Sequence, residues 1–349
     1  MWGLKFAEPA HIQLMVVALL ASLVTSLTPG IDALAAERTP KPGHSLAYVP
    51  RDAKLIASIQ MSAIKTARGL SVLKDFLAKD RCLEQYVGVS PDRIEQIVLV
   101  GLNEDEAASV AIIHAKDSND AASIVEALQP NPQEQVFAGQ TYVRRKIETG
   151  KPVCVFADGK VVVAAREEKH LRRLIVAGAG GATQSKWAFL WRSAADADAI
   201  ALVNIQKLRS SAALNGQFSL AGLFVGTPTQ LAPLMELTTV LVTFDATHQV
   251  HARVQLAGDD SMDQKKLVVA TKAVVEISQA LLSSIRDEAS GHDSQEAELT
   301  LELCDRIDGL LDTVSIRPNE GAVVEASVTI LQDEFAQLFK LGQKLLVTQ

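Results

Sequence analysis

Histidine and serine residues that could bind a metal or attack a substrate are scattered through this 349-residue chain. His248 and His251 have the separation of two metal ligands on a helix, but they fall at a predicted strand. A spacing of three residues in a strand puts them on opposite sides of the pleat. Ser219, in Gly216-Gln-Phe-Ser-Leu-Ala-Gly222, does not have the spacing of a nucleophile elbow. We therefore predict neither a metal site nor a catalytic residue at these positions.

Glycine-rich and acidic segments were considered for phosphate binding and for acid–base catalysis. Gly178-Ala-Gly180-Gly181 follows a predicted helix, Glu167 to Val176, and does not lie between a strand and a helix as a phosphate loop would. We interpret it as a helix C-cap that leads into a flexible link. Paired carboxylates occur at Asp196 and Asp198, at Glu104-Asp105-Glu106 and at Asp259-Asp260. All fall in predicted turns, where acids cap helices or face water, so they predict no catalytic or cofactor site.

The three cysteines do not form a disulfide framework, because their number is odd and no Cys-x-x-Cys pair occurs. Cys82, Cys154 and Cys304 are expected to be buried, unreactive thiols. A single bridge between Cys82 and Cys154 is left open as an alternative.

Composition limits the class of partner. The net charge is −7, and the basic runs Arg144-Arg145-Lys146, Arg172-Arg173 and Lys265-Lys266 are separated by acidic residues. A nucleic-acid-binding surface needs clustered cations, so we interpret each run as a solvated face and expect no nucleic acid partner. With 48% hydrophobic residues the chain can bury a substantial core.

The N-terminal segment has the features of a secretory signal. Lys5 precedes an apolar stretch from Leu14 to Leu27, and Ala33-Leu-Ala35 places small residues before a cleavage point at Ala36. The pattern predicts a signal peptide over 1–35, a linker over 36–47 and a secreted or periplasmic product. The alternative is a protein anchored in the membrane by an uncleaved N-terminal helix, the one form in which we expect membrane contact.

Internal similarity between the two halves of the chain predicts its architecture. Asp52 to Gln60 aligns with Asp198 to Gln206, and in each half two further β-type runs and an amphipathic helix follow in the same order. The pattern predicts a first repeat over 48–177, a linker over 178–195 and a second repeat over 196–349. The predicted fold class is α+β, an internally duplicated unit of mixed or antiparallel sheet with helices packed on one face.

Periodicity also predicts individual elements of the two repeats. In the first, a helix is expected over 120–128, a strand around 141–145, a hairpin over 153–165 with Asp158-Gly159 at its turn, and a helix from Glu167. In the second, a long apolar stripe from Leu267 to Ile285 follows a cap at Asp263, with a further helix over 296–311. A hairpin over 314–330 and a terminal helix over 333–346 complete it.

One segment resembles a known group of proteins. The opening Tyr48-Val49-Pro50-Arg-Asp52-Ala53, together with Pro91-Asp-Arg-Ile-Glu-Gln-Ile97, is similar to uncharacterised secreted bacterial proteins whose mature domain begins in this way. The resemblance implies export and a two-half architecture. It assigns no activity and no functional residue.

Together these observations favour an exported, non-catalytic envelope protein that binds a protein partner or an apolar ligand, with no cofactor. One version of this hypothesis places a lipid in an apolar cavity beside Val274, Val275 and Leu282. The alternatives are an exported hydrolase without a recognisable motif and a scaffold that pairs with copies of itself through sheet edges.

Overall fold

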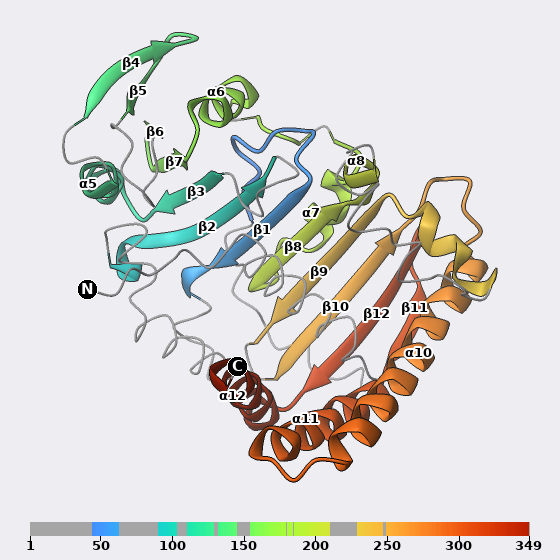
Figure 1. Cartoon of the computed structure of the whole chain (residues 1–349). Helices are drawn as coiled ribbons and strands as arrows, with labels where there is room; N and C mark the ends of the chain where they lie inside the picture. The colour runs from blue at the N-terminus through green and yellow to red at the C-terminus, as the bar shows by residue number, and fades with distance from the viewer. Residues whose placement is uncertain are drawn as a thin grey trace. The chain divides into compact units, whose positions relative to one another are not determined.

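A computed structural model describes residues 44–62, 90–102, 110–128, 132–144, 154–178, 180–183, 185–209, 229–246 and 249–348 (Figure 1). The chain divides into two compact units. The described residues up to 209 belong to unit 1, and those from 229 onward belong to unit 2. The predicted signal segment, Cys82, Ser219, His248 and Glu104–Glu106 lie outside the described residues.

Unit 1 contains an antiparallel sheet in which β1 pairs with a strand on each side. The strand order among its described residues is β8-β1-β2-β3-β7-β6-β5-β4. Its strands are β1 (Leu55–Gln60), β2 (Ile94–Gly101), β3 (Val110–Ala115), β4 (Gln133–Phe137), β5 (Gln140–Arg144), β6 (Cys154–Asp158), β7 (Val161–Ala165) and β8 (Ala199–Asn204). The predicted hairpin over 153–165 and the strand around 141–145 are confirmed as β6–β7 and β5.

Helices lie on both faces of the unit 1 sheet. Helix α6 (Glu168–Ala177) packs over β6 and β7, and Glu168 contacts Tyr142 of β5. The alternate side chains of these strands, which include Val155, Val162 and Ala164, are buried too, and α5 (Ser118–Leu128) contacts β3, β6 and β7. Helices were expected on one face; because both faces of β6 and β7 are apolar, both need cover. The short helix α7 (Ala188–Ser193) and the single-turn elements η2 (Pro91–Arg93) and α8 (Ile205–Arg209) complete the unit.

Unit 2 combines a four-stranded antiparallel sheet with three long helices among its described residues. The strand order is β11-β12-β10-β9, formed by β9 (Thr239–Asp245), β10 (Val250–Ala257), β11 (Ser315–Pro318) and β12 (Val323–Ile330). The helices are α10 (Gln264–Ser290), α11 (Gln295–Leu311) and α12 (Gln332–Thr348), and η4 (Thr229–Glu236) precedes β9. Each predicted helix and the hairpin over 314–330 are confirmed. The Asp263 side chain caps α10 by accepting a hydrogen bond from the Lys265 amide at 3.0 Å.

The long helix α10 uses its apolar stripe in two ways. Near its start, Leu267 packs with Leu237 and Val324 against the sheet. Near its end, Leu282 packs with Cys304 and Leu311, and Val275 packs against them. This close packing does not favour the lipid cavity that was considered beside Val275 and Leu282. The stripe is not buried along its whole length: Leu281, which lies within it, is 60% exposed.

By length and composition α10 could cross a membrane, and among the described helices it alone has these properties. A single helix of this kind is weak evidence of a membrane span, because long helices of soluble proteins can share its composition.

The same strand order occurs in both units. In unit 1 the strands β2-β3-β7-β6 are neighbours in this order, and in unit 2 the strands β9-β10-β12-β11 are neighbours in the matching order. Between the second strand and the last hairpin, unit 1 has α5 and the extra hairpin β4–β5, whereas unit 2 has α10 and α11. This agreement is what a duplication requires, but strand order alone does not establish one. Strand β8, with which the predicted second repeat begins, pairs with β1 inside unit 1.

The segment predicted as a flexible linker over 178–195 is packed where it is described. Gly178 ends α6 with a φ of 66°, as the C-cap interpretation predicted, and its carbonyl accepts the Tyr48 amide at 2.8 Å. Gly181, with a φ of 45°, lies so close to the Leu46 backbone that a Cβ atom there would be 1.8 Å from the Leu46 carbonyl oxygen. The side chains of Trp187 and Trp191 are buried. This segment therefore anchors residues 44–53, including the end of the predicted 36–47 linker.

Replacing Gly181 with alanine tests this close approach. The Gly181→Ala variant should lose more than about 2 kcal/mol of unfolding free energy, because the left-handed backbone and the collision with Leu46 act together. Gly180→Ala is the matched control, since a Cβ atom at Gly180 meets no atom within 4 Å. Urea unfolding of both variants measures the difference; equal stabilities would show that the two backbones are not in contact.

Candidate functional site

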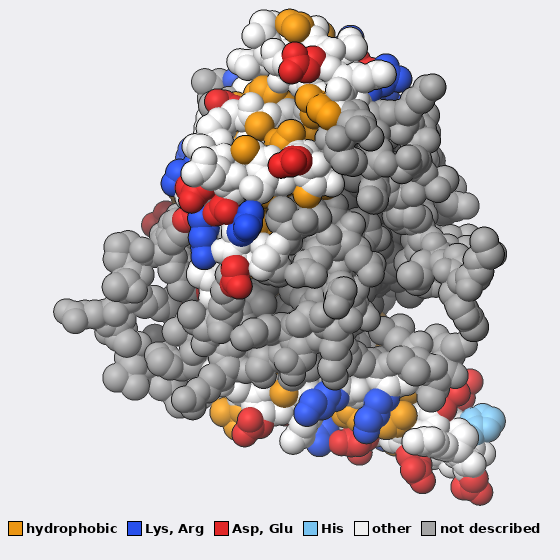
Figure 2. Space-filling model, turned by 90° about the vertical axis from the view of Figure 1, so that its left-hand side faces the viewer, with side chains coloured by type: hydrophobic (Ala, Val, Ile, Leu, Met, Phe, Trp, Pro, Cys, Tyr) orange, Lys and Arg blue, Asp and Glu red, His pale blue; other side chains and the backbone are white. Residues whose placement is uncertain are grey.

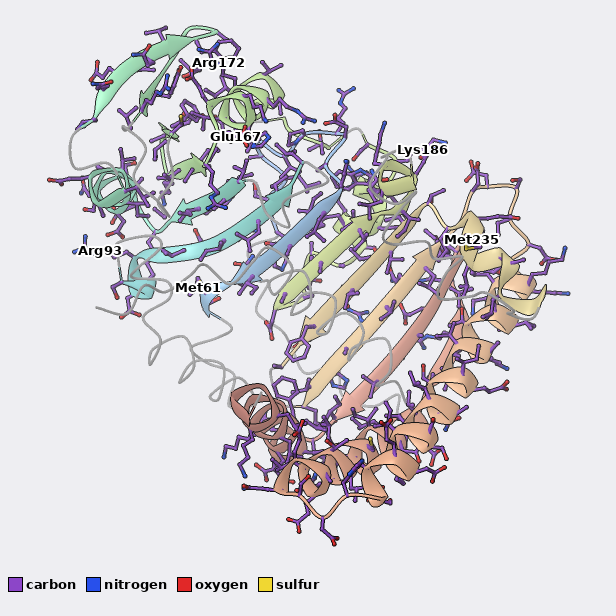
Figure 3. The ribbon with its side chains drawn as sticks, viewed as in Figure 1. Met61, Arg93, Glu167, Arg172, Lys186 and Met235 are labelled. Carbon is purple, nitrogen blue, oxygen red and sulfur yellow. The ribbon has the colours of Figure 1, made fainter. Side chains whose placement is uncertain are left out.

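One face of α6 presents cationic and apolar side chains at helical spacing. Lys169, Arg172, Arg173 and Val176 occupy positions i, i+3, i+4 and i+7, while Leu171, Leu174 and Ile175 of the same helix are buried. Val176 is 71% exposed. Figure 3 labels Arg172 and Glu167 at this helix. The arrangement gives one exposed helix face on which a line of positive charge ends in an apolar side chain.

This face of α6 forms one wall of an open groove of about 630 Å³. We call it the α6 groove; it is lined by Pro50, Arg51, Asp52, Phe137, Lys169, Arg172, Arg173, Val176, Ala177 and Gly181. Four of these residues are cations and one is an acid. Three separate segments therefore contribute to the groove: the loop before β1, the end of β4, and α6 with its C-terminal turn.

Local backbone geometry positions the aromatic wall of the groove. Ala138 and Gly139 form the two-residue turn between β4 and β5 with φ values of 51° and 77°. Two successive left-handed residues are the signature of a type I′ hairpin, whose twist matches that of the strands. This turn places Phe137 at the end of β4, where the Arg172 guanidinium lies over the ring at 4.8 Å.

The arginines of the groove are held by hydrogen bonds to acids and to a tyrosine. Arg173 donates to Asp52 at 2.7 Å, which joins α6 to the loop before β1. Arg172 donates to Glu168 and, at 3.2 Å, to the Tyr142 hydroxyl. Glu168 also accepts hydrogen bonds from Tyr142 and, at 3.0 Å, from Arg144. These contacts orient the guanidinium groups before any ligand arrives.

The same contacts shift the ionisation of the groups involved. The hydrogen bond from Tyr142, assisted by Arg172 and Arg144, lowers the pKa of Glu168 although burial acts against it. Burial, together with the hydrogen bond to Glu168, raises the pKa of Tyr142. At neutral pH the tyrosine is therefore protonated, the glutamate is ionised and the arginines are charged.

A second polar cluster, which sequence analysis missed, is buried beneath β1 and β2. His44 Nδ1 lies 2.6 Å from Ser58 Oγ, and His44 Nε2 lies 2.8 Å from the Ala197 carbonyl. Gln96 donates to Ser58 Oγ at 2.7 Å. A serine beside a histidine is the arrangement of a nucleophile and its base. Here, however, Ser58 is 1% exposed and its oxygen already accepts from Gln96, so this cluster gives no support to the hydrolase alternative.

A third cluster lies on the unit 2 sheet. The buried Glu325 accepts hydrogen bonds from Arg317 at 2.9 Å and from Gln255 at 3.0 Å. Burial by itself would raise the pKa of Glu325, but these hydrogen bonds and the nearby Arg253 outweigh it and lower the pKa. The cluster neutralises a buried carboxylate across three neighbouring strands, which is a structural role.

Unit 1 also has an apolar sheet face that is only partly covered. On β8, β1 and β2 one set of alternating side chains is buried, whereas the other set is half-buried or exposed. In the second set, Ile59 and Leu99 are 38% and 39% exposed. The set consists of Leu55, Ala57, Ile59, Ile97, Leu99, Ala199, Ala201 and Val203.

The residues considered from sequence do not come together in one site. His251 points away from the buried Val250 and Ala252, as predicted, and its Nδ1 lies 2.8 Å from Thr329 Oγ1. Cys154 and Cys304 are buried free thiols, and burial raises the pKa of Cys154 to about 11. Within the described ranges, no three His, Cys, Asp or Glu side chains gather as metal ligands.

The two acidic pairs that the structure describes lie in turns or bends between regular elements, as predicted. Asp196 is exposed, whereas Asp198 is buried and its carbonyl accepts the Gln60 amide at 3.0 Å. Asp259 and Asp260 are exposed in the turn before α10.

Arg172-Arg173 was predicted to be a solvated face, and the sequence did not predict the groove. The signal was present: Lys169, Arg172, Arg173 and Val176 share one face of a predicted helix. The other walls carry no such signal, because Asp52 lies 121 residues from Arg173 in the chain.

Comparisons with known proteins add little. No protein-family model matches the chain, and no curated protein matches it significantly. Among solved structures, crystal form I of TP0453 is similar with a TM-score of 0.38 and 11% identity, over 88% of this chain and 99% of that one. Crystal form III of TP0453 has a TM-score of 0.41 and 11% identity, over 85% and 97%. Similarity at this level is too low to support a specific function.

Glu168 should make the stability of unit 1 depend on pH. Because its pKa is lowered in the folded state, its contribution is present above the unfolded pKa, about 4.3, and is lost as the pH falls through the folded value. We expect Glu168→Gln to cost about 1 kcal/mol at pH 7. The gap from wild type should close progressively below about pH 4. Exposed Glu126 of α5 provides the control Glu126→Gln; a gap that is constant between pH 3 and 7 would contradict the prediction.

Proposed function

We propose that the protein is an exported, non-catalytic binding protein that holds a carboxylate-bearing ligand or protein segment in the α6 groove. The observation that carries this proposal is the exposed line of Lys169, Arg172 and Arg173 beside Phe137 and Val176. A concave surface with a few oriented polar groups and an apolar wall is the usual form of a ligand site.

Electrostatics favour an anionic ligand. The groove is lined by Arg51, Lys169, Arg172 and Arg173, and three of these cations pair with acids: Arg173 with Asp52, Arg172 with Glu168 and Lys169 with Glu167. The cations therefore outnumber these acids by one, in a chain whose net charge is −7. The internal acids hold the guanidinium groups in place but do not neutralise the whole cluster. Planar guanidinium groups bind carboxylates in a defined geometry, and groups that are already oriented lose less entropy on binding.

The apolar wall restricts the ligand further. Val176 is exposed, and Phe137 is half-buried under Arg172. A fully hydrated anion would gain nothing from these side chains, whereas a ligand that carries both carboxylates and apolar groups would cover them. Such a combination is common in protein segments and in amphipathic small molecules.

Charge removal tests the proposal. A fluorescein-labelled hexaglutamate peptide should bind the full chain at low salt and dissociate at 0.5 M salt, because the interaction is largely electrostatic. Arg172→Ala combined with Arg173→Ala should weaken binding at least about tenfold in fluorescence polarisation. Lys265→Ala with Lys266→Ala removes the same charge from exposed positions on α10 and should leave the affinity within about twofold. Equal losses in the two double variants would contradict a site in the groove.

Export is tested by the N-terminal residue of the protein recovered from a bacterial host. The apolar stretch and the small residues before Ala36 lead us to expect a mature chain that begins at Ala36. Intact mass spectrometry measures this directly. A chain that keeps Met1 in the membrane fraction would show the anchored form instead.

A further inference from the structure

The outer edge of β4, with which no described strand pairs, lies beside the α6 groove, and we infer that the ligand is an extended acidic segment of a partner protein that adds to the sheet as a strand next to β4. This inference deepens the proposed function and rests on it. It assigns the ligand class, its conformation and the backbone groups that bind it.

The hairpin geometry shows which backbone groups of β4 are available. The residues that flank a two-residue turn, here Phe137 and Gln140, form a hydrogen-bonded pair, and such pairs alternate along an antiparallel ladder. Gln135 therefore bonds to Tyr142 of β5. The N–H and C=O groups of Glu134 and Val136 consequently point away from β5, toward the outer edge. Within the part of the chain that the structure describes, no strand pairs with that edge.

The alternation of side chains along a strand determines which side chains of an added strand face the groove. Phe137, Gln135 and Tyr142 share one face of the sheet, and this is the face on which Tyr142 contacts Glu168 and Arg172 of α6. In a strand added at β4, every second side chain lies on this face. Carboxylates at those positions come next to Arg172 and Lys169, while the intervening side chains lie on the face of the exposed Val136.

The dimensions of the cationic face match an extended chain. Lys169 and Val176 are seven residues apart, which is about 10 Å along a helix. Three residues of a strand cover roughly the same length, so two acidic side chains on one face fit between the ends of the groove. A single small anion would occupy only one of these positions and would leave Phe137 and Val176 exposed.

β4 lacks several of the features that block edge pairing, and its one charged residue, Glu134, lies on the face of Val136. Its sequence, Gln-Glu-Gln-Val-Phe, contains no proline and no lysine, and its pairing with β5 is regular. Val136 is 70% exposed. Figure 2, which views the molecule from the side where β4 and α5 lie, shows hydrophobic side chains exposed in its upper part. By contrast, the short strand β11 of unit 2 ends in Pro318 and carries Arg317.

Backbone and charge contributions can be separated with one position on β4. Val136→Pro removes the outward N–H without touching the bonds to β5, whereas the control Val136→Thr replaces one of the two methyl groups with a hydroxyl and keeps the N–H. The probe is a labelled seven-residue peptide that alternates glutamate with valine, added to the full chain in fluorescence polarisation. A second probe carries N-methyl groups on the valine amides, which blocks pairing from the peptide side and leaves the protein unchanged.

We expect Val136→Pro and the N-methylated probe each to weaken binding at least about tenfold, Val136→Thr to stay within about threefold, and Arg172→Ala with Arg173→Ala to weaken it as well. Circular dichroism shows whether Val136→Pro is folded. If it is not folded, the result with the N-methylated probe tests strand addition instead.

If only the arginine variant weakens binding, strand addition is overturned but the proposed function stands. Loss with the backbone changes alone overturns the acidic ligand, as does failure of the alternating probe to bind. A dimer that Val136→Pro dissociates would show that a second copy occupies the edge, which also overturns the inference.

Discussion

The contact between the Gly181 backbone and the Leu46 backbone determines how unit 1 is assembled around its candidate site. At this point the segment before β1 crosses the turn after α6, with the Tyr48 amide bonded to the Gly178 carbonyl. No side chain fits between them, so the two backbones fix each other's position. Arg51 and Asp52 follow within a few residues, and their place in the groove depends on this crossing. The left-handed Tyr48 and its hydroxyl bond to Asp158 of the β6–β7 hairpin add a further anchor.

The polar groups of unit 1 divide into two kinds with different consequences. His44, Ser58 and Gln96 are buried and satisfy one another, so they contribute to a unique packing and have no access to a substrate. Around α6 the polar groups are also paired, but the pairs are at the surface: two arginines share Glu168, Arg173 pairs with Asp52, and Lys169 pairs with Glu167. Arg144 and Arg172 both bind Glu168. A ligand carboxylate can therefore bind these cations without leaving a buried charge unpaired. The buried cluster of His44, Ser58 and Gln96 offers no such surface to a ligand.

How much of this could be predicted from sequence depends on the range of the interactions. Local signals worked: the Asp263 cap, the α10 periodicity, the β6–β7 hairpin and the Gly178 C-cap all depend on residues a few positions apart. The α+β class followed from the order of these elements. The groove could not be predicted in this way, because Asp52, Phe137 and Arg173 are far apart in the sequence and come together only in the folded chain. Periodicity marked the apolar stripe of α10 but not which part of it other elements cover, so the exposure of Leu281 could not be read from it.

Part of the apolar sheet surface of unit 1 stays exposed. α5 packs against β3, β7 and β6, whereas Ile59 of β1 and Leu99 of β2 are 38% and 39% exposed. In unit 2, α10 packs against β11, β12 and α11. Since α6 lies on the opposite face of the unit 1 sheet, a ligand in its groove leaves Ile59 and Leu99 as exposed as before. The apolar face and the cationic groove therefore favour different partners. Apolar groups would bury the exposed side chains of the sheet face, whereas carboxylates would bind the cations of the groove.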